Sequence, residues 1–320
     1  MTASFRRIDY SLRPAKHAER RMLCDIFRRL RPFSRIEDYV YVGFGSVWFS
    51  DFSLFHRALG IKNMVSIEQA TTAKERIEAN KPFQIPVVYD RSTNVLPTLD
   101  WSKKHFLWLD YDDPLSVDML LDMRAAAARA GSGTVLAVSV QCSKAPQVAE
   151  AERDGAPPSA VERFRQAFGR ERVAQGVTER QLLNWHYGAL SREMLYDEIR
   201  AALAIRNSGE GARTMNFRSI CNIEYEDGAK MTTIVGIFHT DDDALLVEQC
   251  HFGTLDFLAG RTTPIRITIP KLTPREFKKL EAQLPLPDGV EIDVGTMPEG
   301  DALRFVELYR YLPNFAVLEN

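Results

Sequence analysis

The chain has 320 residues, of which 45% are hydrophobic and 26% are charged, as is typical of a soluble globular protein. Its formal net charge of −2 argues against general polyanion binding, and its scattered cysteines (Cys24, Cys142, Cys221 and Cys250) argue against a disulfide framework or a zinc site. The polar start of the chain predicts neither a signal peptide nor a membrane span, so we expect a cytoplasmic protein.

A basic amphipathic helix is predicted near the start of the chain, in the stretch LRPAKHAERRMLCDIFRRLRPF. Pro14 suits its first turn and Pro32 lies beyond its end. Residues 1–35 contain ten basic and three acidic residues. Five apolar residues recur at helical spacing: Met22, Leu23, Ile26, Phe27 and Leu30.

Short apolar runs then alternate with helical runs. Strands are predicted over residues 39–44, 63–68, 85–90, 105–112 and 134–140. The helices between them include SDFSLFHRAL, closed by Gly60, and SVDMLLDMRAAAARA, ended by Gly131. This alternation predicts parallel βαβ units and an α/β fold with helices on both faces of the sheet.

The second half of the chain is less regular. Residues 141–181 are charged and interrupted by prolines, which predicts an insertion or lid near the strand tips. A helix in QLLNWHYGALSREMLYDEIRAALA and a hairpin over residues 216–238, turning at EDGA, follow. After a strand in IRITIP, Thr273 and Pro274 open a further helix. We expect three parts: a basic helical segment (1–36), a main domain (37–260) and a small α+β extension (261–320).

Glycines and carboxylates follow the first three predicted strands. Gly43 and Gly45 follow the first, Glu68 ends the second and Asp90 ends the third. Because ligands bind at the carboxyl ends of parallel strands, we expect these residues to converge. The glycines allow a close backbone approach, Glu68 suits the two hydroxyls of a ribose, and Asp90 suits the exocyclic amine of an adenine. The alternatives are a helix-capping surface acid for Glu68 and a turn residue for Asp90.

In this order, the landmarks resemble S-adenosylmethionine-dependent methyltransferases of the Rossmann-like class. The resemblance covers roughly residues 37–240 and includes the D…LP phrase formed by Asp90 with Leu96 and Pro97, and Asp110 at the fourth strand. The longer phrases RPAKHAERRM, YVGFGSVWFSDFSLFHRALG and YRYLPNF also resemble bacterial proteins loosely described as O-methyltransferase-like.

The resemblance implies a fold, a cofactor and an activity. The fold would be a seven-stranded, mostly parallel sheet with a reversed terminal hairpin, preceded by the N-terminal helix and followed by the small appendage. The activity would be methyl transfer from S-adenosylmethionine to an oxygen or nitrogen acceptor. The residues that would hold the donor are Gly43, Gly45, Ser46, Glu68, Asp90 and Asp110.

The first loop departs from the family pattern D/E-x-G-x-G-x-G. Tyr41 stands at the acidic position and Val47 at the third glycine. In the family that acid helps to hold the methionine amino group, for which Asp51, Asp110 or Asp112 could substitute. A catalytically inactive module that binds or senses S-adenosylmethionine is therefore an alternative function. NAD is disfavoured as the cofactor, because Trp48 stands where the NAD motif needs a small residue.

The phrase WLDYDDPL places three acids at the end of the fourth strand. Methyl transfer depends mainly on the alignment of donor and acceptor, and a general base adds to it. Because clustered carboxylates repel one another, one of them can have a raised pKa, so Asp110 and Asp112 are the predicted catalytic residues. The alternative is a helix N-cap at Asp112 or Asp113 before Pro114. No metal site is expected.

Lys16, Arg20 and His186 are the candidates for binding the acceptor. Together with His17 and Arg21, the first two could clamp an anionic acceptor, but a solvated helix face is the interpretation that we favour. His186 could line the acceptor pocket or contribute to packing. Nucleic-acid methylation is a further alternative that we do not favour. No membrane contact is expected, and the acceptor and the oligomeric state stay open.

Overall fold

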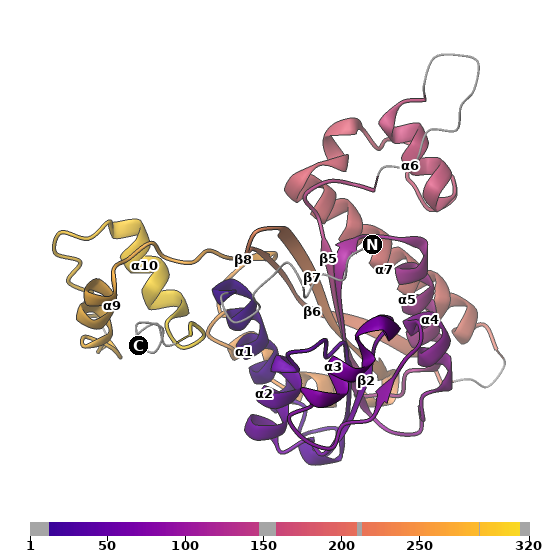
Figure 1. The fold of residues 1–320 in the computed structure, drawn as a ribbon, viewed down its shortest axis with the longest axis horizontal. Coiled ribbons are helices and arrows are strands. Elements are labelled where there is room, and N and C mark those ends of the chain that lie inside the picture. Colours follow the sequence, from indigo (N-terminus) through magenta and orange to yellow (C-terminus); the bar gives the residue numbers. More distant parts are fainter. Residues whose placement is uncertain (1–12, 147–157, 210–212, 288, 314–320) are drawn as a thin grey trace.

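The computed structural model describes residues 13–146, 158–209, 213–287 and 289–313. An eight-stranded sheet forms the centre of the protein, with the strand order β3-β2-β1-β4-β5-β7-β6-β8 (Figure 1). The strands are β1 (Val40–Gly43), β2 (Asn63–Ile67), β3 (Val87–Val88), β4 (His105–Pro114), β5 (Val135–Gln141), β6 (Met215–Glu226), β7 (Lys230–Thr240) and β8 (Ile265–Ile267).

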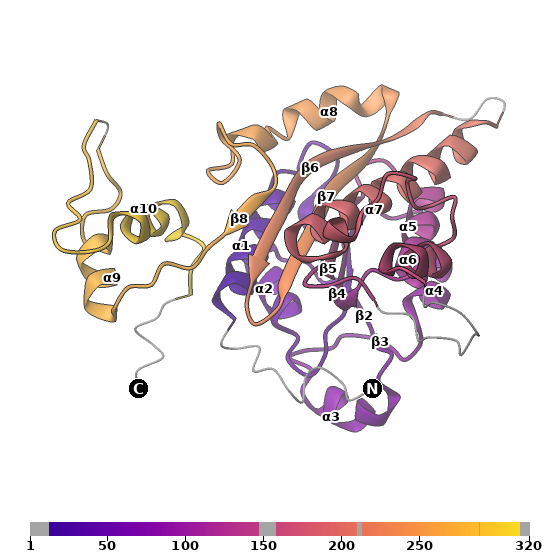
Figure 2. The same cartoon turned by 90° about the horizontal axis from the view of Figure 1, so that it is seen from above.

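The first five strands pair in parallel, and β7 runs antiparallel to both β5 and β6. The α/β class and the reversed hairpin are therefore confirmed. The sheet has eight strands rather than the expected seven, because β8 pairs with β6 in parallel (Figure 2). The stretch IRITIP was recognisable as a strand, but its sequence does not indicate which sheet edge it joins.

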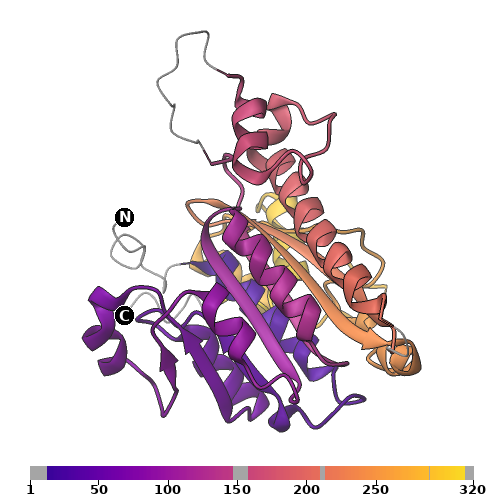
Figure 3. The ribbon, with the colours of Figure 1, turned by 90° about the vertical axis from the view of Figure 1, so that its right-hand side faces the viewer.

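Helices cover both faces of the sheet. The apolar residues of α1, α2, α3 and α8 pack on one face, and those of α4, α5, α6 and α7 pack on the other. Figure 3 shows α5 (magenta) and α7 (salmon) lying side by side against the second face. The helices are α1 (Pro14–Arg28), α2 (Ser50–Leu59), α3 (Lys74–Ala79), α4 (Ser92–Val95), α5 (Val117–Arg129), α6 (Ala160–Phe168), α7 (Asn184–Asn207), α8 (Ala244–Gln249), α9 (Pro274–Glu281) and α10 (Glu299–Leu308).

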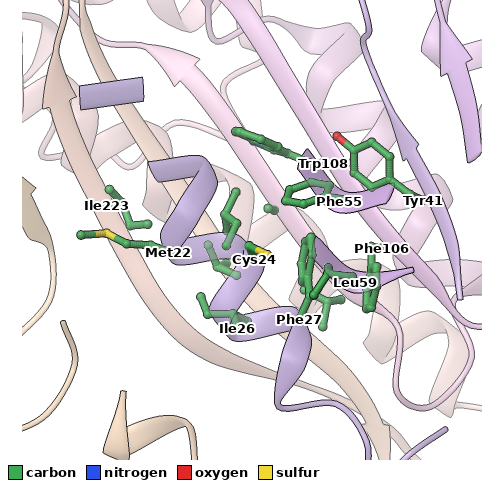
Figure 4. Close-up of a cluster of buried hydrophobic side chains, with 14 of the residues drawn as sticks. Met22, Cys24, Ile26, Phe27, Tyr41, Phe55, Leu59, Phe106, Trp108 and Ile223 are labelled. Carbon is green, nitrogen blue, oxygen red and sulfur yellow. The ribbon is translucent and has the colours of Figure 1, made fainter. Parts of the chain in front are cut away.

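Helix α1 belongs to the main hydrophobic core. It starts at Pro14 as predicted, and all five apolar residues of the predicted stripe are fully buried. The ring of Phe27 stacks on Phe106 of β4 with 4.2 Å between centroids, and Met22 lies close to Ile223 of β6 (Figure 4). The first turn of α1 is fixed by Asp227, whose carboxylate accepts hydrogen bonds from the backbone N–H groups of Ala15 (3.4 Å) and Lys16 (2.8 Å).

Capping residues set the ends of several helices. Gly60 ends α2 with φ +73°, a left-handed conformation that suits glycine. Ser116 caps α5 by accepting a hydrogen bond from the Met119 backbone N–H. The prediction that Asp112 or Asp113 caps this helix is wrong, because both lie within β4, which continues to Pro114.

The C-terminal residues divide between two places. Strand β8 joins the main sheet, whereas α9 and most of α10 lie apart from it at the left of Figure 1; Leu308, the last residue of α10, packs into the main core. These two helices contribute to a small separate core around Leu280, Met297, Ala302 and Phe305. Of the expected insertion at 141–181, residues 147–157 lie outside the described residues. No helix in the described ranges is long and apolar enough to cross a membrane.

Candidate active site

The carboxyl ends of the first parallel strands meet at one edge of the sheet. Gly43, the last residue of β1, pairs with Ser66 of β2 on one side and with Trp108 of β4 on the other. Glu68 follows the end of β2, and Asp110 lies two residues beyond Trp108. This register brings the glycine bend, Glu68 and Asp110 to the same edge, as the sequence predicts.

The bend between β1 and α2 tolerates no side chain at Gly45. A Cβ atom there would lie 2.4 Å from the Phe49 ring and 2.8 Å from Ser66 Oγ. The Gly45 backbone N–H donates to that same Ser66 oxygen at 3.0 Å, which fixes the bend on β2. Ser46 has φ +48°, in the left-handed region. Trp48 is 42% exposed, so its ring is turned toward solvent.

Glu68 holds this bend from the neighbouring strand. Its Oε1 accepts a hydrogen bond from the Ser46 backbone N–H at 2.5 Å, and the residue is only 8% exposed. Burial, together with the negative charges of Asp51 and Asp112, raises the pKa of Glu68 to about 7, although the hydrogen bond from Ser46 opposes this rise. The interpretation of Glu68 as a helix-capping surface acid is wrong, because the side chain is buried and binds the bend.

Asp51 brings a buried carboxylate to the same place. It lies in the first turn of α2, is 8% exposed, and accepts a hydrogen bond from the Tyr41 hydroxyl. Burial raises the pKa of Asp51, and the positive charge of Arg20 opposes this rise. Tyr41 occupies the acidic position of the family pattern. Its hydroxyl donates a hydrogen bond to Asp51, so a carboxylate from α2 lies next to this position. The sequence suggested Asp51 only as one of three substitutes.

Lys16 of α1 forms an ion pair with Asp110. Its Nζ lies 2.5 Å from Asp110 Oδ1 and 2.8 Å from Glu19 Oε2, and Lys16 and Glu19 are fully buried. The same ammonium lies 4.4 Å from the centroid of the Trp108 ring, a cation–π distance. The pair therefore connects the N-terminal helix to the tip of β4.

A chain of buried hydrogen bonds extends this ion pair across the sheet. Thr233 donates to Glu19 Oε1, the Thr233 and Ser139 hydroxyls lie 2.8 Å apart, and Trp108 Nε1 donates to Ser139 at 3.1 Å. Sequence reasoning missed Glu19, Ser139 and Thr233, because nothing in their local sequence marks them as partners of residues in distant segments.

The interpretation of the basic helix as a solvated face is wrong for two residues. Lys16 is fully buried and Arg20 is 9% exposed, whereas Arg21 and Arg28 are exposed. The guanidinium of Arg20 forms no ion pair with any described residue, and its buried Nε has no hydrogen-bond partner. Helical periodicity predicted that Arg20 would lie on the solvent-facing side of α1. In the structure α2 and β6 both contact α1, and they cover part of its polar side in addition to the apolar stripe.

Asp90 and Asp112 lie at the predicted edge but are less buried. Asp90 is exposed, and its Oδ1 accepts hydrogen bonds from the Arg91 backbone N–H (2.7 Å) and from Asn94 Nδ2 (2.8 Å). These bonds hold the pKa of Asp90 below its usual value. Asp112 is half-buried in β4, close enough to Glu68 for its charge to raise the pKa of that residue.

His186 is separated from this group. It lies in the first turn of α7, which packs on the opposite face of the sheet from α1. The side chain is exposed, and its Nε2 accepts a hydrogen bond from Arg180 Nε at 3.2 Å. Within the described residues, no contact joins His186 to the other predicted site residues. No group of three His, Cys, Asp or Glu side chains in those residues is arranged to hold a metal ion.

A family model described as "Putative O-methyltransferase" matches residues 8–320 of this chain. Among curated proteins, none matches it.

Among solved structures, the chain is similar to cofactor-bound Rv0187 from MTB, with 13% identity over 73% of this chain and 84% of that chain and a TM-score of 0.39. It is also similar to an S-adenosylmethionine-dependent methyltransferase from Clostridium acetobutylicum ATCC 824 (9% identity, 73% and 93% coverage, TM-score 0.39). A third is the fibrillarin pre-rRNA processing protein of Methanococcus jannaschii (8% identity, 64% and 68% coverage, TM-score 0.36). These similarities are distant.

Proposed function

Because the chain belongs to the O-methyltransferase family, whose model spans residues 8–320, we propose that it transfers a methyl group from S-adenosylmethionine to an oxygen atom of an acceptor molecule. The donor carries this methyl group on a positively charged sulfur, and its transfer depends mainly on how donor and acceptor are aligned. The observation that supports the proposal best is the glycine bend held by buried Glu68 at the carboxyl edge of the sheet.

The residues around the bend fit the adenosine part of the donor. Glu68 uses Oε1 for the bend, and its Oε2, which has no hydrogen-bond partner within the described residues, is available to accept from ribose hydroxyls. Gly45 and Gly43 shape the bend, because Phe49 and Ser66 fill the space beside Gly45 and Tyr41 fills the space beside Gly43. Asp90 uses Oδ1 for its own turn and keeps Oδ2 for the adenine amine.

Asp110 and Asp112 are the proposed residues on the acceptor side. The Lys16 ammonium binds Asp110 Oδ1 and thereby fixes the direction of the carboxylate, so that Oδ2 can receive the hydrogen of an acceptor hydroxyl. Asp112 lies two residues further along β4, in the segment between Asp110 and Pro114 where the pairing with β5 shifts its register, and its charge acts on Glu68. Lys16 acts through Asp110 and is a positioning residue in this proposal.

Calorimetry with S-adenosylmethionine, S-adenosylhomocysteine and NAD tests the proposal. We expect the wild type to bind the first two ligands and to prefer both over NAD. In Glu68→Ala, both affinities should fall by roughly 10- to 100-fold, the effect of losing charge-assisted hydrogen bonds to the ribose.

Glu75→Ala is the matched control, because it removes an exposed carboxylate from the segment after β2 and should leave the affinities unchanged. A wild type without preference for the methyl donor over NAD would contradict the proposal.

A catalytically inactive binding or sensor module is the alternative suggested by the irregular first loop. Incubation with a panel of hydroxyl- and amine-bearing acceptors, followed by mass spectrometry, separates the two functions. Methylated product establishes turnover and shows whether oxygen or nitrogen is modified. Binding of S-adenosylmethionine without any product across the panel would favour the sensor.

A nucleic-acid acceptor is less well supported. Of the four basic residues considered for contact with a polyanion, Lys16 and Arg20 are buried and His17 is half-buried, which leaves Arg21 as the exposed member. Salt-dependent polyanion binding that is lost when both Arg20 and Arg21 are changed to Ala would reinstate this acceptor class.

A further inference from the structure

Arg20 is a buried cation without a counterion among the described residues. Only 9% of the residue is exposed, and its Nε is buried with no hydrogen-bond partner. A buried charge is costly unless an opposite charge or hydrogen-bonding groups satisfy it. Arg21, the next residue on the helix, is exposed to solvent, so α1 does not bury every arginine that it carries. The position of Arg20 therefore suits an anion supplied by a ligand.

The second buried cation of α1 is satisfied within the protein. Lys16, one turn earlier, binds both Glu19 and Asp110. These two acids are thus already engaged by Lys16, and neither forms an ion pair with Arg20. The two cations therefore differ: Lys16 is paired with two carboxylates, whereas Arg20 has a buried Nε without a hydrogen-bond partner among the described residues.

Asp51 lies within the electrostatic range of Arg20 without forming an ion pair with it. The charge of Arg20 acts on both Asp51 and Tyr41, and the Tyr41 hydroxyl occupies Oδ2 of Asp51. The helices that carry the two residues, α1 and α2, pack against each other, so the site presents a carboxylate and a guanidinium that interact electrostatically without an ion pair. A ligand that carries an ammonium group and a carboxylate group on the same carbon atom can pair with the Asp51 carboxylate and with the Arg20 guanidinium at the same time.

We propose that Arg20 and Asp51 form the receptor for an α-amino acid group, in which Arg20 binds the carboxylate and Asp51 binds the ammonium. The guanidinium fork matches a carboxylate in a bidentate arrangement, which a lysine at this position would not reproduce. This inference rests on the proposed function, because the methionine end of S-adenosylmethionine is the expected source of the group.

The position of Asp51 favours the donor over an amino acid acceptor as that source. Asp51 is the second residue of α2, which follows the bend, and its charge contributes to the raised pKa of Glu68 on the other side of that bend. A single ligand that crosses the bend can therefore place its ribose at Glu68 and its amino acid end at Asp51. Arg20 is accordingly assigned to the donor, rather than to the anionic acceptor for which the sequence suggested it.

Calorimetry on the full chain with three ligands tests this receptor. The ligands are S-adenosylhomocysteine, its decarboxylated analogue, which keeps the amine, and 5′-methylthioadenosine, which lacks the amino acid end. We expect the wild type to bind S-adenosylhomocysteine at least about tenfold more tightly than the decarboxylated analogue. In Arg20→Met this preference should disappear while the affinity for 5′-methylthioadenosine stays the same, and Arg20→Lys should restore only part of the preference.

Two controls separate recognition from folding. Arg21→Met removes an exposed arginine from the same helix and should leave all three affinities unchanged. The thermal unfolding temperature of ligand-free Arg20→Met should equal or exceed that of the wild type, because the variant removes an unsatisfied buried charge. A structural role for Arg20 predicts a lower unfolding temperature instead.

Three results would overturn the receptor. In the first, Arg20→Met lowers the affinity for all three ligands equally, which would mean that Arg20 has a structural role. In the second, the wild type binds all three ligands alike, so that the donor's amino acid end is not recognised and the proposed function still stands. In the third, no adenosine ligand binds, and the proposed function fails together with the receptor.

Discussion

Glu68 is a carboxyl group whose charge changes in the neutral pH range, because burial raises its pKa to about 7. Ribose hydroxyls donate hydrogen bonds to the ionised carboxylate, so binding of the donor should require the deprotonated form. Between pH 6 and pH 8 the ionised fraction rises from about one tenth to about nine tenths. We therefore expect the association constant of S-adenosylhomocysteine, measured by calorimetry, to increase roughly tenfold over this interval.

Glu68→Gln is the control for this pH dependence. The amide has nearly the same shape as the acid but does not titrate, so its affinity should be lower and should vary little between pH 6 and pH 8. If this variant keeps the full pH dependence of the wild type, another group is responsible for it.

At the same scale, the sequence predicted single residues at strand ends better than it predicted their partners. Glu68 and Gly45 were identified because parallel strands place such residues at one edge, and the structure brings both to the bend. The pairing of Lys16 with Asp110, 94 residues away, depends on how α1 docks. The sequence contains no local signal for that docking beyond the apolar stripe.

The docking of α1 depends on its first turn as well as on its apolar residues. Arg13, at the N-cap position, provides no side-chain cap, and Asp227 from the turn between β6 and β7 accepts the N–H groups of Ala15 and Lys16. Asp227→Ala should lower the free energy of unfolding by about 1 kcal/mol, as is usual for the loss of a helix cap. Urea unfolding followed by circular dichroism measures this change.

Glu226→Ala provides the comparison for Asp227→Ala. Glu226 is exposed and adjacent, and its surface ion pair with Lys230 should contribute less than about 0.5 kcal/mol. Equal losses in the two variants would mean that Asp227 does not act as a cap.

Among the elements, those with local signals were predicted most closely. The start of α1 at Pro14, the end of α2 at Gly60 and the opening of α9 at Thr273 and Pro274 are all confirmed, and α9 adds a capping box between Thr273 and Glu276. Strand β3 is limited to Val87–Val88, shorter than expected, because it lies at the sheet edge and pairs only with β2. The length of such a strand is set by its neighbour, which its own sequence does not reveal.

At the scale of the whole molecule, the described residues contain a large core on both faces of the sheet and a smaller core between α9 and α10. Phe27 and Phe305 are buried phenylalanines in the large and the small core, respectively. Phe27→Ala should cost about 3–5 kcal/mol and weaken S-adenosylhomocysteine binding, because α1 carries Lys16 and Arg20. Phe305→Ala should loosen α9 and α10 and leave binding unchanged.

Hydrogen exchange with and without S-adenosylhomocysteine measures both effects. Faster exchange should be confined to α9 and α10 in Phe305→Ala, and should spread to α1 and β4 in Phe27→Ala. If Phe305→Ala accelerates exchange in α1 as strongly as in α10, the two cores unfold as one unit.

The contacts of α1 also bear on the order in which parts of the protein can fold during synthesis. Lys16 leaves the ribosome long before its partners on the sheet, and Asp227 follows it by 211 residues. Until the hairpin has been made, Met22, Leu23 and Phe27 have no complete surface to pack on, and a nascent helix of this kind is a natural target for chaperones. A chain that terminates before residue 227 lacks the turn that anchors α1, so we expect the proposed donor site to form only after the hairpin has been synthesised.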